Sequence, residues 1–337
     1  MTLTASLTTV LAIDDPSQVG HARRTAQKLA QTLGFDESDA GRVALVATEL
    51  TSNLLKHAGQ GVLHLRRLVS ARGRAGVELL SIDHGQGFDP VHCMTDGFSS
   101  SGTQGIGLGS VVRGAQVFDV HTDSHGSVVL ARLYAGDGVD DDLRIGVSQH
   151  SLHDDPACGD TWQVALREGG LHALVIDGLG HGEEAERAAQ AGAQAFGQAP
   201  FEAPQQVLER MHAAMCGSRG GAVGMAQYDA GEYKLRYLGV GNIGATLVKG
   251  DGSRGLASMP GIVGGQYRKA QVFEQSEIEG HLLILYSDGL QSRWNLNHYP
   301  GLVHRHPAVI AAVLHRDFCR GRDDVTVLVI DLELSHA

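Results

Sequence analysis

The sequence has few of the residues that mark several classes of protein. Its 337 residues include only four cysteines, and none of them form a C-x-x-C pair, so we expect reduced thiols and no structural zinc site (Cys93, Cys158, Cys216 and Cys319). No apolar run is long enough to span a membrane, and the first residues lack the basic and apolar segments of a signal peptide. We therefore expect a cytoplasmic protein with no membrane partner.

Positive charge and aromatic residues are also scarce. There are 27 Lys and Arg residues against 38 Asp and Glu, which gives a formal net charge of −11, and aromatics make up 5% of the chain. Non-specific nucleic-acid binding requires a basic surface, so we expect no nucleic-acid partner. Glycine is abundant, at 45 residues, without a Gly-X-Y period, which indicates turns and binding loops.

Length and pattern together predict two domains. The hydrophobic content of 42% is sufficient for packed cores, and 337 residues exceed the usual size of one domain. In the N-terminal part, the spacing of apolar residues predicts helices over 17–33, 38–58 and 106–114, and strands over 62–70, 77–83, 117–122 and 128–133. The polar, acidic segment 134–142 is the expected linker, and strands and helices alternate again beyond it.

Aspartates stand at the ends of several apolar strands in the C-terminal part. Asp177 follows the run 171–176 and precedes three closely spaced glycines, and Asp288 follows a second run in the same way. Asp323 and Asp324 precede the closing strand, and Asp160 precedes another. A single Asp-Gly at a strand end is often only a turn. Four acidic points gathered by the fold would require a proton or a metal between them, and carboxylates suit hard cations such as Mg²⁺ or Mn²⁺.

These Gly-Asp, Asp-Gly-x-Gly-His-Gly, Ser-Asp-Gly and Asp-Asp-x-Thr segments resemble, in order, the motifs of the SpoIIE-type (PPM) metal-dependent serine/threonine phosphatases. The resemblance covers about residues 144–332. It implies a centre of two Mg²⁺ or Mn²⁺ ions in which Asp177 bridges both ions and is the central catalytic ligand. The Gly178 carbonyl and Asp160 would serve the first ion, and Asp288 and Asp323 the second. Asp324 remains an alternative to Asp323.

A second group of motifs lies in the N-terminal part. Glu49 and Asn53 are four residues apart on the predicted helix 38–58, so they share one face beside its apolar stripe. An ordinary amphipathic helix also explains that pair. Further on, Asp83 ends a strand and is followed by two spaced glycines, Gly85 and Gly87. A glycine-rich loop then leads into a helix, where backbone N–H groups can bind phosphates (Gly105, Gly107 and Gly109).

Taken in order, these segments resemble the N, G1 and G2 boxes of GHKL ATPases, with the RsbT/RsbW anti-sigma-factor serine kinases as the most similar branch. The resemblance covers about residues 10–134. It implies that Asn53 holds the Mg²⁺ bound to ATP and that Glu49 activates the attacking hydroxyl. Asp83 would accept a hydrogen bond from the adenine amino group, with Gly85 and Gly87 allowing close approach. Gly105, Gly107 and Gly109 would line the phosphates.

The two resemblances imply an α+β protein, with a GHKL (Bergerat) α/β sandwich at 1–134, a linker at 135–143 and a PPM-type α-β-β-α sandwich at 144–337. They imply a bifunctional partner-switching regulator, with an ATP-dependent serine/threonine kinase-like domain and a metal-dependent phosphoserine/phosphothreonine phosphatase domain. The expected partner is a STAS-domain anti-sigma-factor antagonist or stressosome protein. A sigma factor or downstream regulator is a possible further partner, and a homodimer is a possible oligomeric state. Two alternatives are a phosphatase with a non-catalytic ATP-binding or docking domain, and a non-catalytic protein that sequesters a sigma factor.

Overall fold

The chain forms two compact units, each of which is described by itself. The computed structural model describes residues 1–89, 107–136 and 142–333. Unit 1 comprises Met1–Leu7, Arg144–Val303 and Leu314–Ala337, and unit 2 comprises Thr8–Leu143 and His304–Val313. Both units are discontinuous in sequence, because residues 1–7 group with the C-terminal part and residues 304–313 with the N-terminal part.

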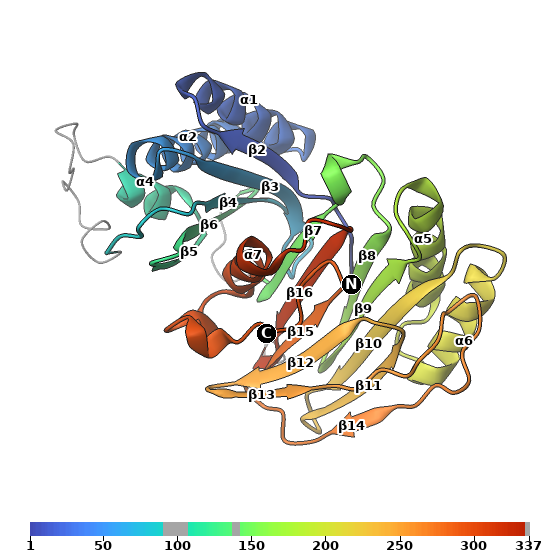
Figure 1. The fold of residues 1–337 in the computed structure, drawn as a ribbon. Helices are drawn as coiled ribbons and strands as arrows, with labels where there is room; N and C mark the ends of the chain where they lie inside the picture. The colour runs from blue at the N-terminus through green and yellow to red at the C-terminus, as the bar shows by residue number, and fades with distance from the viewer. Residues whose placement is uncertain (90–106, 137–141, 334–337) are drawn as a thin grey trace. The chain divides into compact units, whose positions relative to one another are not determined.

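Unit 2 is built on a five-stranded antiparallel sheet in the order β2-β3-β4-β6-β5 (Figure 1). Side chains alternate between the two faces of this sheet, as strand geometry requires. Leu63, Leu65 and Leu79 belong to the hydrophobic core under the helices, and their neighbours along the chain point to the opposite face. The strands are β2 (Thr9–Ile13), β3 (Gly61–Val69), β4 (Ala75–Ile82), β5 (Val117–Asp123) and β6 (Gly126–Tyr134).

The helices of unit 2 are α1 (Pro16–Thr32), α2 (Glu37–Asn53) and α4 (Gly107–Gly114). Helix α1 begins where Asp15 caps it, because the Asp15 side chain and Gln18 form a capping box and Pro16 occupies the first turn. Its buried face consists of alanines, which let α1 and α2 pack closely (Ala22, Ala26 and Ala30). The predicted helix 38–58 is confirmed in position, but its last five residues, Leu54–Ala58, form a π-helix.

The face of the unit 2 sheet opposite the helices buries a network of charged side chains. The Arg66 and Arg132 guanidinium groups donate to the Glu78 carboxylate at distances between 2.6 and 3.0 Å, and all three side chains are buried. Burial opposes ionisation of Glu78, but the two arginines lower its pKa below the ordinary value. Arg132 also donates to Asp142 at 2.8 Å. Asp142 was predicted to lie in a linker, and this contact explains why it packs with the unit instead.

Unit 1 contains two sheets packed face to face (Figure 1). The six-stranded sheet has the order β1-β8-β9-β10-β11-β14, and the five-stranded sheet has the order β13-β12-β15-β16-β7. The strands of the first are β1 (Thr2–Thr4), β8 (Asp160–Arg167), β9 (Gly170–Gly178), β10 (Gly221–Asp229), β11 (Lys234–Val240) and β14 (Phe273–Gln275). Those of the second are β7 (Ile145–His150), β12 (Gly244–Lys249), β13 (Gly252–Gly255), β15 (Leu282–Tyr286) and β16 (Val325–Asp331).

Two helices cover the outer face of the six-stranded sheet. Helices α5 (Glu183–Gln198) and α6 (Pro204–Met215) pack on the six-stranded sheet, where Phe196 is fully buried. Residues 314–318 of α7 (Pro307–Phe318) belong to unit 1, and the His315 ring stacks there on the His150 ring of β7, with centroids 4.0 Å apart. Three short 3₁₀ turns complete the described part (Leu152–Asp154, Leu296–His298 and Leu302–His304). The predicted α+β class is therefore confirmed.

The structure describes three of the four cysteines and the helices that bear on membrane spanning. Cys158, Cys216 and Cys319 are free, and Cys93 lies outside the described residues. Among the helices of the described ranges, none combines the length and the apolarity needed to cross a membrane.

Candidate active sites

The acidic site of unit 1 starts from two aspartates on neighbouring strands. Asp160, at the start of β8, pairs in register with Asp177, near the end of β9. Asp160 is buried, and the Ser287 hydroxyl donates to its Oδ2 at 2.5 Å. Burial raises the pKa of Asp160 well above the ordinary value, and the nearby charge of Asp177 raises it further. The fold thus places a carboxylate that resists ionisation directly beside a second one.

Asp177 has charged neighbours from distant parts of the chain. Burial, and then the charges of Asp288, Asp323 and Asp324, raise the pKa of Asp177 to about 7. The strand ends that carry these residues are therefore close enough to interact electrostatically. Within residues 1–89, 107–136 and 142–333, however, no three His, Cys, Asp or Glu side chains are grouped tightly enough to hold one ion. The structure shows an acidic cluster with unfavourable charge, which a divalent cation or a proton would relieve.

Asp323 and Asp324 have different surroundings. The Asp324 carboxylate is buried, and its two oxygens accept hydrogen bonds from the backbone N–H groups of Leu152 and Gly159, each at 2.6 Å. Asp323 is partly exposed and accepts one hydrogen bond, at 2.9 Å, from the backbone N–H of Asp324. Asp324 therefore joins chain segments, while Asp323 retains an oxygen that can face a ligand. This difference favours Asp323 as the ligand, which stays a prediction.

Two residues that sequence reasoning did not assign to the site hold its carboxylates in place. The Asn242 side chain donates to Asp288 Oδ2 at 2.7 Å. Ser287 is fully buried and, besides donating to Asp160, accepts from the Thr326 backbone N–H at 2.9 Å. The signal was present in the sequence, because Asn242 follows a Gly-Val-Gly turn and Ser287 directly precedes Asp288. Only the tertiary structure shows which carboxylates Asn242 and Ser287 bind.

Glycines allow the strand ends to approach one another. A Cβ on Gly178 would lie 2.3 Å from the Ala185 carbonyl oxygen, and one on Gly289 would lie 2.1 Å from the Asp324 carbonyl oxygen. Neither position has space for any side chain, since real Cβ atoms do not come so close to backbone oxygens. The two Asp-Gly pairs are thus required by packing, and the same packing places Asp177 and Asp288 at the acidic cluster.

The candidate nucleotide site of unit 2 includes Glu49 and Asn53 on α2. The start of α4 lies beside Asn53, because a Cβ on Gly107 would be 3.7 Å from Asn53 Oδ1. Burial raises the pKa of Glu49, and the charge of Lys56 partly opposes this change. Gly109 lies within α4, and Gly105 lies outside the described residues. The structure thus brings Gly107 to Asn53, and Glu49 lies one helical turn from Asn53 on α2.

Asp83 follows the end of β4 and is held by backbone donors. Its Oδ1 accepts from the N–H groups of Gly85 at 2.8 Å and Ser127 at 3.1 Å. Gly87 has a φ of 72°, and a Cβ there would lie 2.5 Å from the Asp123 carbonyl oxygen. Asp83 is therefore fixed with one carboxylate oxygen engaged, an arrangement suited to accepting a hydrogen bond at the other.

The N-terminal part of the chain matches a known family. The family described as histidine kinase-like ATPase domain matches residues 13–133. The serine/threonine-protein kinase RsbT of Bacillus subtilis (strain 168) is 33% identical over 102 residues, which cover 30% of this chain and 76% of RsbT. The chain belongs to the histidine kinase-like ATPase family. The GHKL part of the predicted fusion is thereby confirmed.

Solved structures are also similar to this member of the histidine kinase-like ATPase family. One, described with the words "The bacterial stressosome: a modular system that has been adapted to control secondary messenger signaling", is 26% identical with a TM-score of 0.51. This match covers 55% of this chain and 97% of that chain. Another is RsbX in complex with magnesium, at 20% identity and a TM-score of 0.47, covering 63% of this chain and 98% of its own.

Proposed function

We propose that the chain is a bifunctional partner-switching regulator. Unit 1 is a metal-dependent phosphoserine/phosphothreonine protein phosphatase, and unit 2 is an ATP-dependent serine/threonine kinase-like domain. The observation that carries the first assignment is the acidic cluster, in which Asp160 and Asp177 both have raised pKa values. The second assignment is supported by the similarity of the N-terminal part to a serine/threonine-protein kinase.

The residues of the acidic cluster fit a pair of Mg²⁺ or Mn²⁺ ions in chemistry, since carboxylate and carbonyl oxygens are their preferred ligands. Asp160, Asp177, the Gly178 carbonyl, Asp288 and Asp323 would hold them. Such ions lower the pKa of bound water and stabilise charge on phosphoryl oxygens.

Other residues of unit 1 position those ligands. Asn242 orients Asp288, and Ser287 fixes Asp160. Asp324 ties Leu152 and Gly159 to the start of β16, so that the strand ends stay together. A side-chain carboxylate with a hydrogen-bonded partner binds a cation with less loss of conformational freedom, and loss of such partners reduces metal affinity.

In unit 2, Asn53 would hold the Mg²⁺ that accompanies ATP, and Asp83 would accept from the adenine amino group. Glu49 has a raised pKa, which suits a general base near the attacking hydroxyl. Phosphoryl transfer depends chiefly on positioning and charge neutralisation, so few protein groups are needed. As protein substrate we propose a STAS-domain phosphoprotein of an anti-sigma-factor or stressosome system, supported by the similarity to RsbT and to a stressosome structure.

The phosphatase assignment is tested with the full chain and a phosphoserine substrate. Wild type should release phosphate only with Mn²⁺ or Mg²⁺, and Asp177→Asn should abolish the release. Asp251→Asn, in an exposed turn, is the matched control and should retain turnover. Normal turnover by Asp177→Asn would exclude the acidic cluster as the catalytic site.

The kinase assignment is tested in the Asp177→Asn background, where removal of phosphate no longer hides its addition. With labelled ATP and a STAS-domain partner, this variant should phosphorylate the partner, and a further Glu49→Gln change should stop the transfer while ATP still binds. ATP binding without transfer in both proteins would favour the alternative of a regulatory ATP-binding domain. Loss of Mg-ATP binding on Asn53→Ala is expected under either alternative.

A further inference from the structure

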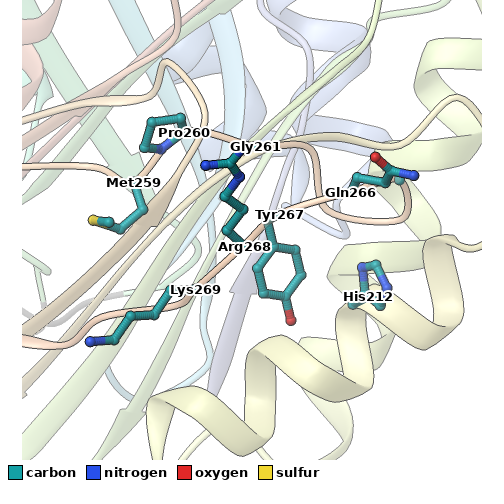
Figure 2. Close-up of a pocket in the computed structure, with 9 residues that line it drawn as sticks. His212, Met259, Pro260, Gly261, Gln266, Tyr267, Arg268 and Lys269 are labelled. Carbon is teal, nitrogen blue, oxygen red and sulfur yellow. The ribbon is translucent and has the colours of Figure 1, made fainter.

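A separate cavity of about 940 Å³ lies in unit 1 between α6 and the loop 259–269 (Figure 2). Its lining combines aromatic, apolar and cationic side chains, including His212, Met259, Pro260, Tyr267, Arg268 and Lys269. Figure 2 shows Tyr267 pointing toward the helix that carries His212. None of these residues belongs to the acidic cluster.

The loop that forms one wall of this cavity is attached to α6. The Gly264 backbone N–H donates to His212 Nδ1 at 2.9 Å, and the Tyr267 ring meets the His212 ring edge-on with centroids 5.1 Å apart. Gly264 has a φ of 85°, and a Cβ there would lie 2.7 Å from Met215 Cβ. The hydrogen bond and the ring contact therefore hold the loop against α6. Position 264 has no space for a residue larger than glycine.

The cavity carries positive charge in an acidic protein. Arg268 and Lys269 are exposed, and among the described residues neither has an ion-pair or hydrogen-bond partner. One acidic side chain also acts on the wall, because the charge of Glu209 on α6, after burial, helps to raise the pKa of Tyr267. Two unpaired cations beside an aromatic wall, in a chain of net charge −11, indicate an anionic ligand.

The cavity wall is also connected to the acidic cluster. Val263 pairs with Gly221 through two backbone hydrogen bonds of 2.9 and 3.0 Å, and Gly221 pairs in register with Gly178. Two strand spacings separate Val263 from Gly178, or roughly 10 Å. The bridge between Gly261 and Tyr267 adds at most two residue rises and one strand spacing, or about 11 Å, on the way to Arg268. An extended peptide rises about 3.3 Å per residue, so a residue held at the cluster and one held in the cavity would be about three to six positions apart.

We propose that this cavity binds an acidic segment of the protein substrate, about three to six residues from the phosphorylated residue. Arg268 and Lys269 pair with its carboxylates, and Tyr267 supplies an apolar wall for the peptide. The cavity thus selects the substrate, while the acidic cluster carries out the reaction. This inference rests on the proposed phosphatase function of unit 1.

The test compares two phosphoserine peptides that differ only at about positions three to six on both sides of the phosphoserine, with Glu in one and Gln in the other. Wild type should show a kcat/KM about tenfold higher for the Glu peptide, through KM, since two exposed ion pairs contribute about that much. Arg268→Ala/Lys269→Ala should treat both peptides alike. Its hydrolysis of p-nitrophenyl phosphate should equal that of wild type, because the changed residues do not touch the acidic cluster.

The matched control is Lys249→Ala/Arg254→Ala, which removes the same charge from the hairpin β12–β13 outside the cavity. It should keep the preference for Glu, and about 0.5 M salt should remove the preference from wild type. A double variant at 268 and 269 that still prefers the Glu peptide would overturn the proposal. An equal loss in the control would also overturn it, because general attraction would then explain the preference.

Fluorescence anisotropy with the unphosphorylated, labelled Glu peptide separates this inference from the proposed function. Binding that depends on Arg268 and Lys269 without any phosphatase turnover would support the cavity and contradict the phosphatase assignment. Turnover without such binding or preference would do the reverse. Displacement of the peptide by millimolar inorganic phosphate at constant ionic strength would reassign the cavity to a small anion and overturn the proposal.

Discussion

Replacing Asp177 by Asn should stabilise unit 1 in the absence of metal while abolishing its activity. In the folded chain the pKa of Asp177 is about 7, against an ordinary value of 3.8, because of burial and the charges of Asp288, Asp323 and Asp324. An acid whose pKa is raised on folding contributes full stability below its unfolded pKa and loses that contribution as pH rises through its folded pKa. The destabilisation by Asp177 therefore grows from about pH 4 and is complete above about pH 7.

The magnitude follows from the change in pKa. At ~1.36 kcal/mol per pH unit, a rise from 3.8 to about 7 corresponds to an upper value of about 4 kcal/mol at pH 8. Asp177 is partly exposed, and solvent screens part of the repulsion, so we expect about 2 kcal/mol. Asn has nearly the same shape without the charge. Asp177→Asn should thus increase the free energy of unfolding by about 2 kcal/mol at pH 8 in EDTA, and by little at pH 4.5.

Urea unfolding monitored by tryptophan fluorescence reports the unfolding of unit 1. Both tryptophans of the chain, Trp162 and Trp294, lie in unit 1. Mn²⁺ should raise the unfolding midpoint of wild type and have little effect on Asp177→Asn, while Asp251→Asn should behave as wild type throughout. If Asp177→Asn were no more stable than wild type at pH 8 in EDTA, the reasoning from charge repulsion would be refuted.

Three further changes give distinct outcomes. Asp324→Ala removes the acceptor of two backbone N–H groups and should lower the free energy of unfolding by about 3 kcal/mol. Asp323→Ala should change the free energy of unfolding by less than about 1 kcal/mol and abolish metal-dependent turnover. The reverse pattern in urea unfolding and phosphate release would exchange the roles of the two aspartates. Asn242→Ala frees Asp288 and should weaken Mn²⁺ activation about tenfold, measured as the Mn²⁺ concentration for half-maximal rate; an unchanged value would exclude the orienting role. Burial lowers the pKa of His172 to about 4 from 6.5, so the unfolded chain binds the proton at a higher pH than the folded chain does. The free energy of unfolding of unit 1 should therefore fall by up to about 3 kcal/mol as pH falls from about 6.5 to 4. His172→Gln should reduce this fall, and the same pH dependence in the variant as in wild type would contradict the reasoning.

Much of the candidate sites was readable from local sequence because each motif depends on neighbouring residues. An apolar run followed by Asp-Gly encodes a strand and its turn within about eight residues, and this was sufficient to predict Asp177 and Asp288 at strand ends. The Glu49–Asn53 pair follows from helical spacing alone. The RsbT likeness and the histidine kinase-like family match confirm the assignment of the N-terminal segments.

Other features depend on partners far along the chain. The strand β1 (Thr2–Thr4) has no pattern of its own, and it forms because β8 offers an edge more than 150 residues later. Asp142 looked like part of a linker until Arg132 and His306 were seen to bond to it. The π-helical end of α2 likewise had no signal in the spacing of apolar residues.

The sequence by itself determined many of the helices and strands and placed carboxylates at strand ends, because propensity and periodicity act over a few residues. The tertiary structure decided which of those carboxylates is available. Asp323 and Asp324 are adjacent and chemically identical. They differ because the backbone N–H groups of Leu152 and Gly159 donate hydrogen bonds to Asp324. That choice depends on contacts across more than 160 residues, and local sequence carries no information about such contacts.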